Sequence, residues 1–186
     1  TNSACSPKNY ALVYQRIAQM FPNIVFYVAG VSPSQQETDF NDKSKIVKTD
    51  FEVRWAQGDY WLYQSIMEIK NIMSKCPSGV ALHAYGDISE SGEGTIVNDI
   101  KSQIRALRLS GCAQVQTIVS EFNSADVYKN SPSGLAKYIP LVYEFFKSQG
   151  IDGSMWFTYG KWGEENEHKN AAINADLKNA INNYGK

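Results

Sequence analysis

The feature of this sequence that most limits its fold is a regular alternation of short apolar runs with longer amphipathic stretches. The apolar runs occupy residues 23–30, 79–86, 115–122 and 152–160. Runs of this length that are apolar almost throughout are typical of strands buried on both faces, as in parallel sheets. The alternation therefore predicts an α/β fold in which parallel strands are joined by helical crossovers.

The amphipathic stretches predict five helices. The first has Ser6 as an N-cap residue and Pro7 at its first position, which is a common helix start. Its apolar residues Tyr10, Val13, Tyr14, Ile17 and Met20 share one helical face. In the third predicted helix, Ile96, Ile100, Ile104 and Leu107 form an apolar stripe. Gly111 follows the stripe and is a typical residue at the end of a helix. We expect the helices at residues 7–20, 51–74, 94–111, 133–150 and 168–185, and a polar surface loop at 31–50.

The length of 186 residues suits a single α/β domain that spans residues 1–186, with one helix followed by four strand–helix units. A complete eight-stranded barrel needs about 200–250 residues. Four strands fit a half or incomplete TIM-like barrel, and the alternative is a small doubly wound sheet.

Composition excludes several classes of function. The formal net charge is -1, so no basic field points to nucleic acid or to anionic lipid. No apolar run is long enough to span a membrane. The chain has three cysteines with no CxxC pair and no histidine cluster, and it lacks GxGxxG and GxxxxGK[ST] sequences. We expect neither a metal nor a cofactor.

Two of the cysteines occupy equivalent places. Cys76 and Cys112 each stand just before a predicted strand, and neighbouring strands would bring them within bridging range. A disulfide would indicate an oxidising compartment and an extracellular or secreted protein. The alternatives are free buried thiols and a cytoplasmic location.

Polar residues follow each apolar run, in "VAGVSP", "HAYGD", "SEFNS" and "WFTYGKW". Because parallel strands share one direction, these groups lie at the same edge of the sheet. Glu121 stands out, since a glutamate within an apolar strand costs several kcal/mol to bury unpaired. It is either a catalytic carboxylate or a strand-end charge that caps a helix or pairs with a lysine.

These strand ends resemble those of the clan A glycoside hydrolases, retaining (β/α)8-barrel enzymes with two catalytic glutamates. The order of "LHAYG", "VSEFN" and "SMWFTYG" matches the ends of strands six, seven and eight in that group. The resemblance implies that Glu121 is the nucleophile and that Tyr85 and His83 orient it. It also implies a sugar site that includes Trp156, Asn123, Tyr159 and Trp162, with Asn123 where the group usually has glycine.

The resemblance also exposes a missing residue. The group's acid/base glutamate lies at the end of strand four, usually in "NEP", and no such dipeptide occurs before Cys5. The chain thus resembles strands five to eight, and it would self-associate or bind a partner chain to complete the barrel. Acids that could replace the missing one are Asp87, Glu90, Glu93, Glu164, Glu165 and Glu167, which as loop residues are more typical of solvated charge.

Three hypotheses follow from these residues. The first is a retaining O-glycoside hydrolase that acts on an oligosaccharide or polysaccharide once the barrel is complete. The second is a non-catalytic carbohydrate-binding or assembly module derived from such a barrel. The third is an unrelated doubly wound protein, in which His83 is a core histidine and Trp156 a packing residue. Trp55, Tyr60 and Trp61 lie near the same edge, and for Trp61 we expect helix packing.

Overall fold

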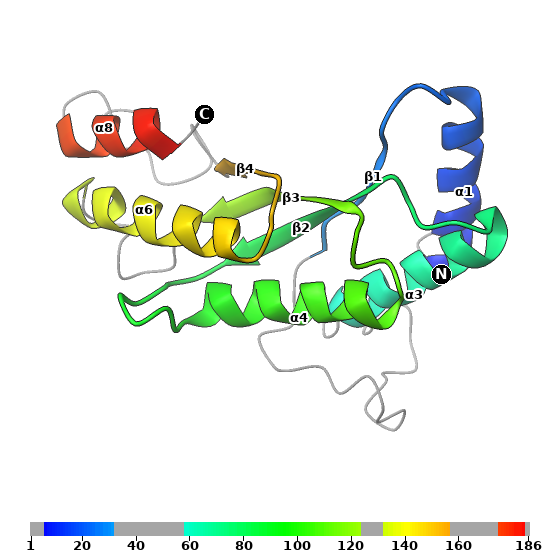
Figure 1. Ribbon diagram of the computed structural model, residues 1–186, viewed down its shortest axis with the longest axis horizontal. Coiled ribbons are helices and arrows are strands. Elements are labelled where there is room, and N and C mark those ends of the chain that lie inside the picture. The colour runs from blue at the N-terminus through cyan, green and yellow to red at the C-terminus, as the bar shows by residue number, and fades with distance from the viewer. Residues whose placement is uncertain (1–5, 32–57, 124–131, 157–174, 185–186) are drawn as a thin grey trace.

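Strands and helices alternate along the chain in the computed structural model (Figure 1). The structure describes residues 6–31, 58–123, 132–156 and 175–184. The predicted α/β class is confirmed. The elements are α1 (Pro7–Met20), β1 (Tyr27–Val28), α3 (Gly58–Met73), β2 (Gly79–Tyr85), α4 (Thr95–Leu109), β3 (Gln116–Asn123), α6 (Pro132–Ser148), β4 (Gly153–Trp156) and α8 (Ala175–Tyr184).

The four strands form one parallel sheet in the order β1-β2-β3-β4. Spatial order therefore follows chain order, and the described strands contain no reversal. A doubly wound sheet reverses its order at a switch point, whereas a barrel-type sheet does not. The parallel sheet is thus established, and closure into a barrel stays a prediction.

Strand β1 is much shorter than the predicted run at residues 23–30. Only Tyr27 and Val28 pair with β2, opposite Gly79 and Val80. The run begins instead with a turn, in which the Ile24 amide donates to the Phe21 carbonyl at 3.1 Å. The predicted loop at 31–50, the start of the second helix and the first part of the closing helix lie outside the described residues, apart from Val31.

Helix α1 has the predicted boundaries, but the predicted apolar face is only partly buried. Ser6 Oγ accepts a hydrogen bond from the Asn9 amide at 3.3 Å, and Pro7 follows it as expected. The helix packs against α3, and its buried residues are Ala11 and Tyr14. Val13 and Met20 are instead 57% and 63% exposed. Burial follows the neighbouring helix rather than the full width of the apolar arc.

The core lies between the sheet and the helices that flank it. The β2 and β3 residues that face these helices are fully buried, and the predicted stripe on α4, which runs alongside the strands, is buried as well (Figure 1). We call this side of the sheet the helix face: Val80, Leu82, Ala84, Val119 and Phe122. Because successive side chains of a strand point to opposite sides, the alternate residues form an open face: Ala81, His83, Tyr85, Ile118 and Glu121.

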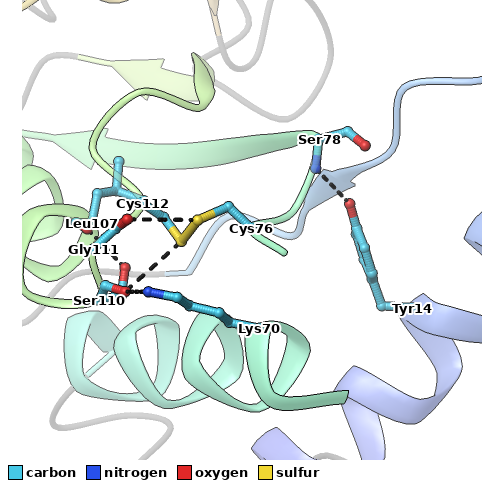
Figure 2. The surroundings of a disulfide bond; sticks show 8 residues. All are labelled: Tyr14, Lys70, Cys76, Ser78, Leu107, Ser110, Gly111 and Cys112. Atoms are coloured by element: carbon cyan, nitrogen blue, oxygen red, sulfur yellow. Dashed lines mark hydrogen bonds between the residues drawn. A yellow bond between two sulfur atoms is a disulfide. The ribbon is translucent and has the colours of Figure 1, made fainter. Parts of the chain in front are cut away.

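A disulfide joins Cys76 and Cys112, so the pairing left open by the sequence is formed (Figure 2). It links the segments that lead into β2 and β3, and it therefore lies at the edge of the sheet where these strands begin. Among the hydrogen bonds drawn in Figure 2, Lys70 Nζ donates to the Ser110 carbonyl at 3.0 Å, and the Ser78 amide donates to Tyr14 Oη at 3.1 Å. Helices α1 and α3 thereby hold the same edge.

Candidate functional site

The structure brings three of the predicted site residues together on the open face. The Tyr85 hydroxyl at the end of β2 donates a hydrogen bond to Glu121 Oε2 on β3. His83 Nδ1 lies 3.7 Å from the same oxygen. The side chains of His83 and Glu121 are 17% and 31% exposed, so the carboxylate is held from within the protein and still reaches solvent. This arrangement lies near the carboxyl ends of parallel strands, where α/β enzymes place their chemistry.

A β-bulge directs Glu121 to the open face. Leu82 pairs with Val119, but the next β2 residue, His83, pairs with Glu121, so Ser120 is an extra residue in β3. With regular alternation from Val119, Glu121 would point to the helix face. The bulge moves it to the side of His83, and Ser120 Oγ donates to the Leu82 carbonyl at 3.4 Å. Bulges of this kind are enriched beside active sites, where they re-aim a side chain.

The two neighbours of Glu121 have altered acidities. Burial raises the pKa of Tyr85, and its hydrogen bond to Glu121 and the charge of that residue raise it further. Tyr85 is therefore a protonated donor at neutral pH. Burial lowers the pKa of His83, and the charge of Glu121 partly offsets this effect. Near pH 7 the imidazole is thus predominantly neutral, so the pair supplies hydrogen-bonding groups rather than a full positive charge.

Gly30 allows His83 to occupy its place. A Cβ atom at position 30 would lie only 2.2 Å from His83 Cδ2, so any larger residue would displace the imidazole. The ring also meets Tyr85 edge to face, with centroids 6.4 Å apart and an interplanar angle of 82°. These contacts fix the orientation of the ring beside Glu121.

Sequence reasoning missed two buried residues on α4 that hold the main chain of this site. Gln103 Oε1 accepts from the His83 amide at 3.3 Å, and Gln103 Nε2 donates to the His83 carbonyl at 2.7 Å. Asp99 Oδ2 accepts from the Tyr85 amide at 3.4 Å. A signal was present in the sequence: both are polar residues three positions after an isoleucine of the apolar stripe, where the helix period predicts burial.

The other predicted sugar-site residues are only partly described. Asn123 is buried at the end of β3, opposite Tyr85, and its carbonyl accepts from the Gly86 amide at 3.0 Å. The main chain of Trp156 pairs with Phe122, next to Glu121, but its side chain is outside the described part of the molecule. Tyr159 and Trp162 also lie outside the described residues.

The proposed substitute acids that can be described belong to the loop after β2. Glu90 and Glu93 are exposed, as expected for solvated charge. Glu90 lines a cavity of about 320 Å³ together with Pro140 and Phe145 of α6, on the helix side of the sheet. The Asp87 amide donates to Thr95 Oγ1 at 3.1 Å. Glu164, Glu165 and Glu167 fall outside the described residues, and no second carboxylate hydrogen-bonds or ion-pairs with Glu121 in the described part of the chain.

Two aromatic residues of the predicted edge can be assigned. Trp61 is buried and meets Tyr10 of α1 with ring centroids 5.0 Å apart, which confirms its helix-packing role. Tyr60 Oη accepts a hydrogen bond from Gln64 Nε2 at 2.9 Å. Trp55 is not among the described residues.

In the ranges that the structure describes, His, Cys, Asp and Glu side chains form no group of three that could hold a metal ion. Each helix in those ranges is too short or too polar to cross a membrane. The chain matches no protein-family model, and a comparison with curated proteins finds no match either.

Proposed function

We propose that this chain carries the nucleophile of a retaining β-glycoside hydrolase of barrel type, with Glu121 as that nucleophile. The observation that carries the proposal is the contact of Glu121 with Tyr85 and His83 on the open face. A carboxylate that attacks an anomeric carbon must be exposed to substrate and fixed in orientation. Glu121 is partly exposed, and both neighbours contact the same oxygen, which leaves Oε1 for the substrate.

The reaction also needs a second carboxyl group, which protonates the leaving oxygen from about 5–5.5 Å away. No such group contacts Glu121 in the described residues. In line with the resemblance to strands five to eight, the proposed enzyme takes its acid from further strand–helix units that complete the barrel, supplied by a second copy or by a partner chain. Its substrate is an oligosaccharide or polysaccharide that lies across the open face.

A surface on α1 supports the proposed assembly. Several large apolar side chains of α1 and the turn after it are exposed beside β1, at one end of the sheet. Large apolar side chains exposed together on one helix and the turn after it are typical of an interface. In the described residues α1 packs against α3, α3 against α4 and α6 against α8, so this patch is where a further helix would pack on α1. We call it the α1 patch: Val13, Ile17, Met20, Phe21, Ile24 and Val25.

The disulfide supports a secreted or extracellular location, because such bonds persist in oxidising compartments.

The decisive experiment uses a reagent that reacts without a general acid. A 2-deoxy-2-fluoro β-glycoside with a dinitrophenolate leaving group needs no proton donor, so a nucleophile alone can form the glycosyl–enzyme bond. We expect mass spectrometry of the purified chain to find the sugar on the peptide that contains Glu121, for at least one of the gluco, galacto, xylo and manno reagents. Glu121→Gln should abolish the label. The matched control Glu93→Gln, an exposed glutamate after the neighbouring strand, should keep it.

A second candidate function is a carbohydrate-binding module without catalysis, which is favoured because no second carboxylate contacts Glu121 among the described residues. It predicts that no reagent labels the chain, whereas oligosaccharide binding by calorimetry persists in Glu121→Gln. Absence of both labelling and binding would contradict both proposals.

A further inference from the structure

The edge of β2 that faces β1 has lost its strand partner where the candidate site begins. Strand β1 ends at Val28, opposite Val80, and no described strand pairs with this edge beyond that point. The Gly86 amide donates to Asn123 on β3, so the main-chain groups of the alternate residues His83 and Tyr85 point the other way. Buried groups of this kind need other partners.

Side chains of α4 supply these partners. Gln103, which is fully buried, uses its amide as a strand would: the oxygen accepts from the His83 amide and the nitrogen donates to the His83 carbonyl. The same nitrogen donates its second hydrogen to the Asp99 carbonyl at 3.0 Å. Only this orientation of the amide matches donors with acceptors at all three positions.

Asp99 is the second α4 residue that binds the main chain of β2, and its burial lowers the stability of the fold. It is 3% exposed, its Oδ2 accepts from the Tyr85 amide, and its Oδ1 has no hydrogen-bond partner in the described part of the chain. Burial raises the pKa of Asp99 to about 7, the Tyr85 amide lowers it, and the charge of Asp59 on α3 raises it. A well-packed apolar residue would be more stable here than a half-satisfied carboxyl.

We infer that Gln103 and Asp99 are positioning residues that fix the main chain of β2 at His83 and Tyr85, and thereby the place of both side chains beside Glu121. The inference deepens the proposed function and rests on it for its activity assay. Neither residue touches Glu121, so their effect passes through His83 and Tyr85. The inference explains why polar groups occupy two core positions of α4 directly behind the site.

The test compares Gln103→Leu with a matched control, Ser102→Ala. Ser102 is the adjacent buried polar residue of α4, and its hydroxyl donates to Asp59 on α3 rather than to β2. The first readout is the NMR titration of His83, which is simple to follow because the chain has only two histidines. Gln103→Leu should raise the pKa of His83 toward its ordinary value, because a displaced ring is less buried. Ser102→Ala should leave the titration unchanged.

The second readout is the rate at which the fluoroglycoside labels Glu121. Misplacing a reacting group by about 1 Å can cost on the order of a hundredfold in rate, so we expect a loss of roughly 10- to 100-fold in Gln103→Leu. We expect less than about threefold in Ser102→Ala. If wild type is not labelled at all, the proposed function fails, and the titration alone decides the positioning role.

Asp99 gives a second pair of variants in case Gln103→Leu does not fold. Asp99→Asn keeps an oxygen for the Tyr85 amide and should preserve both readouts, whereas Asp99→Ala removes that acceptor and should change them. Equal His83 titrations in wild type, Gln103→Leu and Asp99→Ala would overturn the inference. So would a change of the same size in Ser102→Ala, because the effect would then report a general loosening of α4.

Discussion

The centre of the sheet and its α1 end are built in opposite ways. At the centre, polar side chains are buried: Asp99 and Gln103 lie in the core, and each contacts the main chain of β2. At the α1 end, apolar side chains are exposed, and Val13 and Met20 are more than half accessible. Each arrangement costs stability in an isolated domain. The difference is what the two proposals above require: buried polar groups that hold a site within this chain, and an exposed apolar patch that forms a contact outside it.

Truncation of the central core should have the largest effect on stability. Phe122 is fully buried and packs edge to face on Phe146, with ring centroids 5.2 Å apart. Phe122→Ala should lower the free energy of unfolding by about 3–5 kcal/mol, because it leaves a cavity in the core. Urea titration followed by circular dichroism measures this loss. A loss below about 1 kcal/mol would mean that the helix face is not the main core.

The buried carboxyl of Asp99 should make the centre sensitive to pH. The pKa of Asp99 is about 7 in the folded protein and 3.8 ordinarily, so between these values the folded state binds more protons than the unfolded state. Stability due to this group therefore falls as pH rises from about 4 to about 7, by at most about 4 kcal/mol. Asp99→Asn should remove this fall. If the curves of unfolding free energy against pH were parallel for wild type and Asp99→Asn, this prediction would be wrong.

Loss of the disulfide should weaken the edge of the sheet opposite the site. The bond joins cysteines 36 positions apart, and replacement of both Cys76 and Cys112 by alanine should cost about 2–4 kcal/mol. Thermal unfolding of the double variant measures the effect. The His83 titration should stay unchanged, because the bond lies at the opposite ends of β2 and β3. A shifted titration would show that the two edges are coupled.

Loss of the contact between Glu121 and His83 should change the stability of the fold less than loss of the disulfide does. The charge of Glu121 raises the pKa of His83 against the effect of burial, so Glu121→Gln should lower that pKa further. Because the pKa lies below its ordinary value of 6.5, stability due to His83 is present above about pH 6.5 and is lost as pH falls. The variant should extend this loss to lower pH. NMR titration against His168 checks the direction, and an unchanged His83 curve would contradict the pairing.

The smallest effect on stability is expected at the α1 patch. Val13→Ala should change the free energy of unfolding by less than about 0.5 kcal/mol, since the side chain is mostly exposed. Met20→Glu should nevertheless weaken self-association, or binding of a partner, because it places a charge in the patch. Sedimentation velocity compares this variant with Lys8→Glu, an exposed control on the same helix. If wild type and both variants sediment identically, the α1 patch is not an interface.

Much of the fold could be predicted from periodicity, whereas the detail of the site could not. Helix α1 begins and ends as predicted because Ser6 and Pro7 are local signals, and the α4 stripe is buried because its period is regular. The shared strand ends predicted only that these residues lie at one edge of the sheet, and the contact of Tyr85 and His83 with Glu121 was implied by the resemblance to the clan A enzymes. The bulge at Ser120 and the short β1 depend on contacts between distant segments, which no local pattern encodes.

The buried polar residues show a second limit of prediction. Gln103 and Asp99 fit the helix period of the core, but their partners are main-chain groups of β2 that are distant in sequence. The exposed α1 patch shows the reverse case. Its apolar residues fit the core pattern, yet none of the described elements covers them.

The bulge in β3 also determines which changes of chain length the sheet can accept. Between Leu82 and His83 the neighbouring strand β2 advances one position while β3 advances two, and between Val119 and Phe122 β3 advances three positions while β4 advances two. Strand β3 thus holds one residue more than either neighbour needs. Deletion of Ser120 would equalise the three strands and leave Glu121 on the open face opposite His83. Insertion of one residue after Ser120, with regular alternation restored, would place Glu121 three positions after Val119, which is again the open face, but opposite Tyr85. At this position a one-residue deletion would keep the Glu121 carboxylate in its present register with His83, whereas a one-residue insertion would keep its face of the sheet but shift it along the strand.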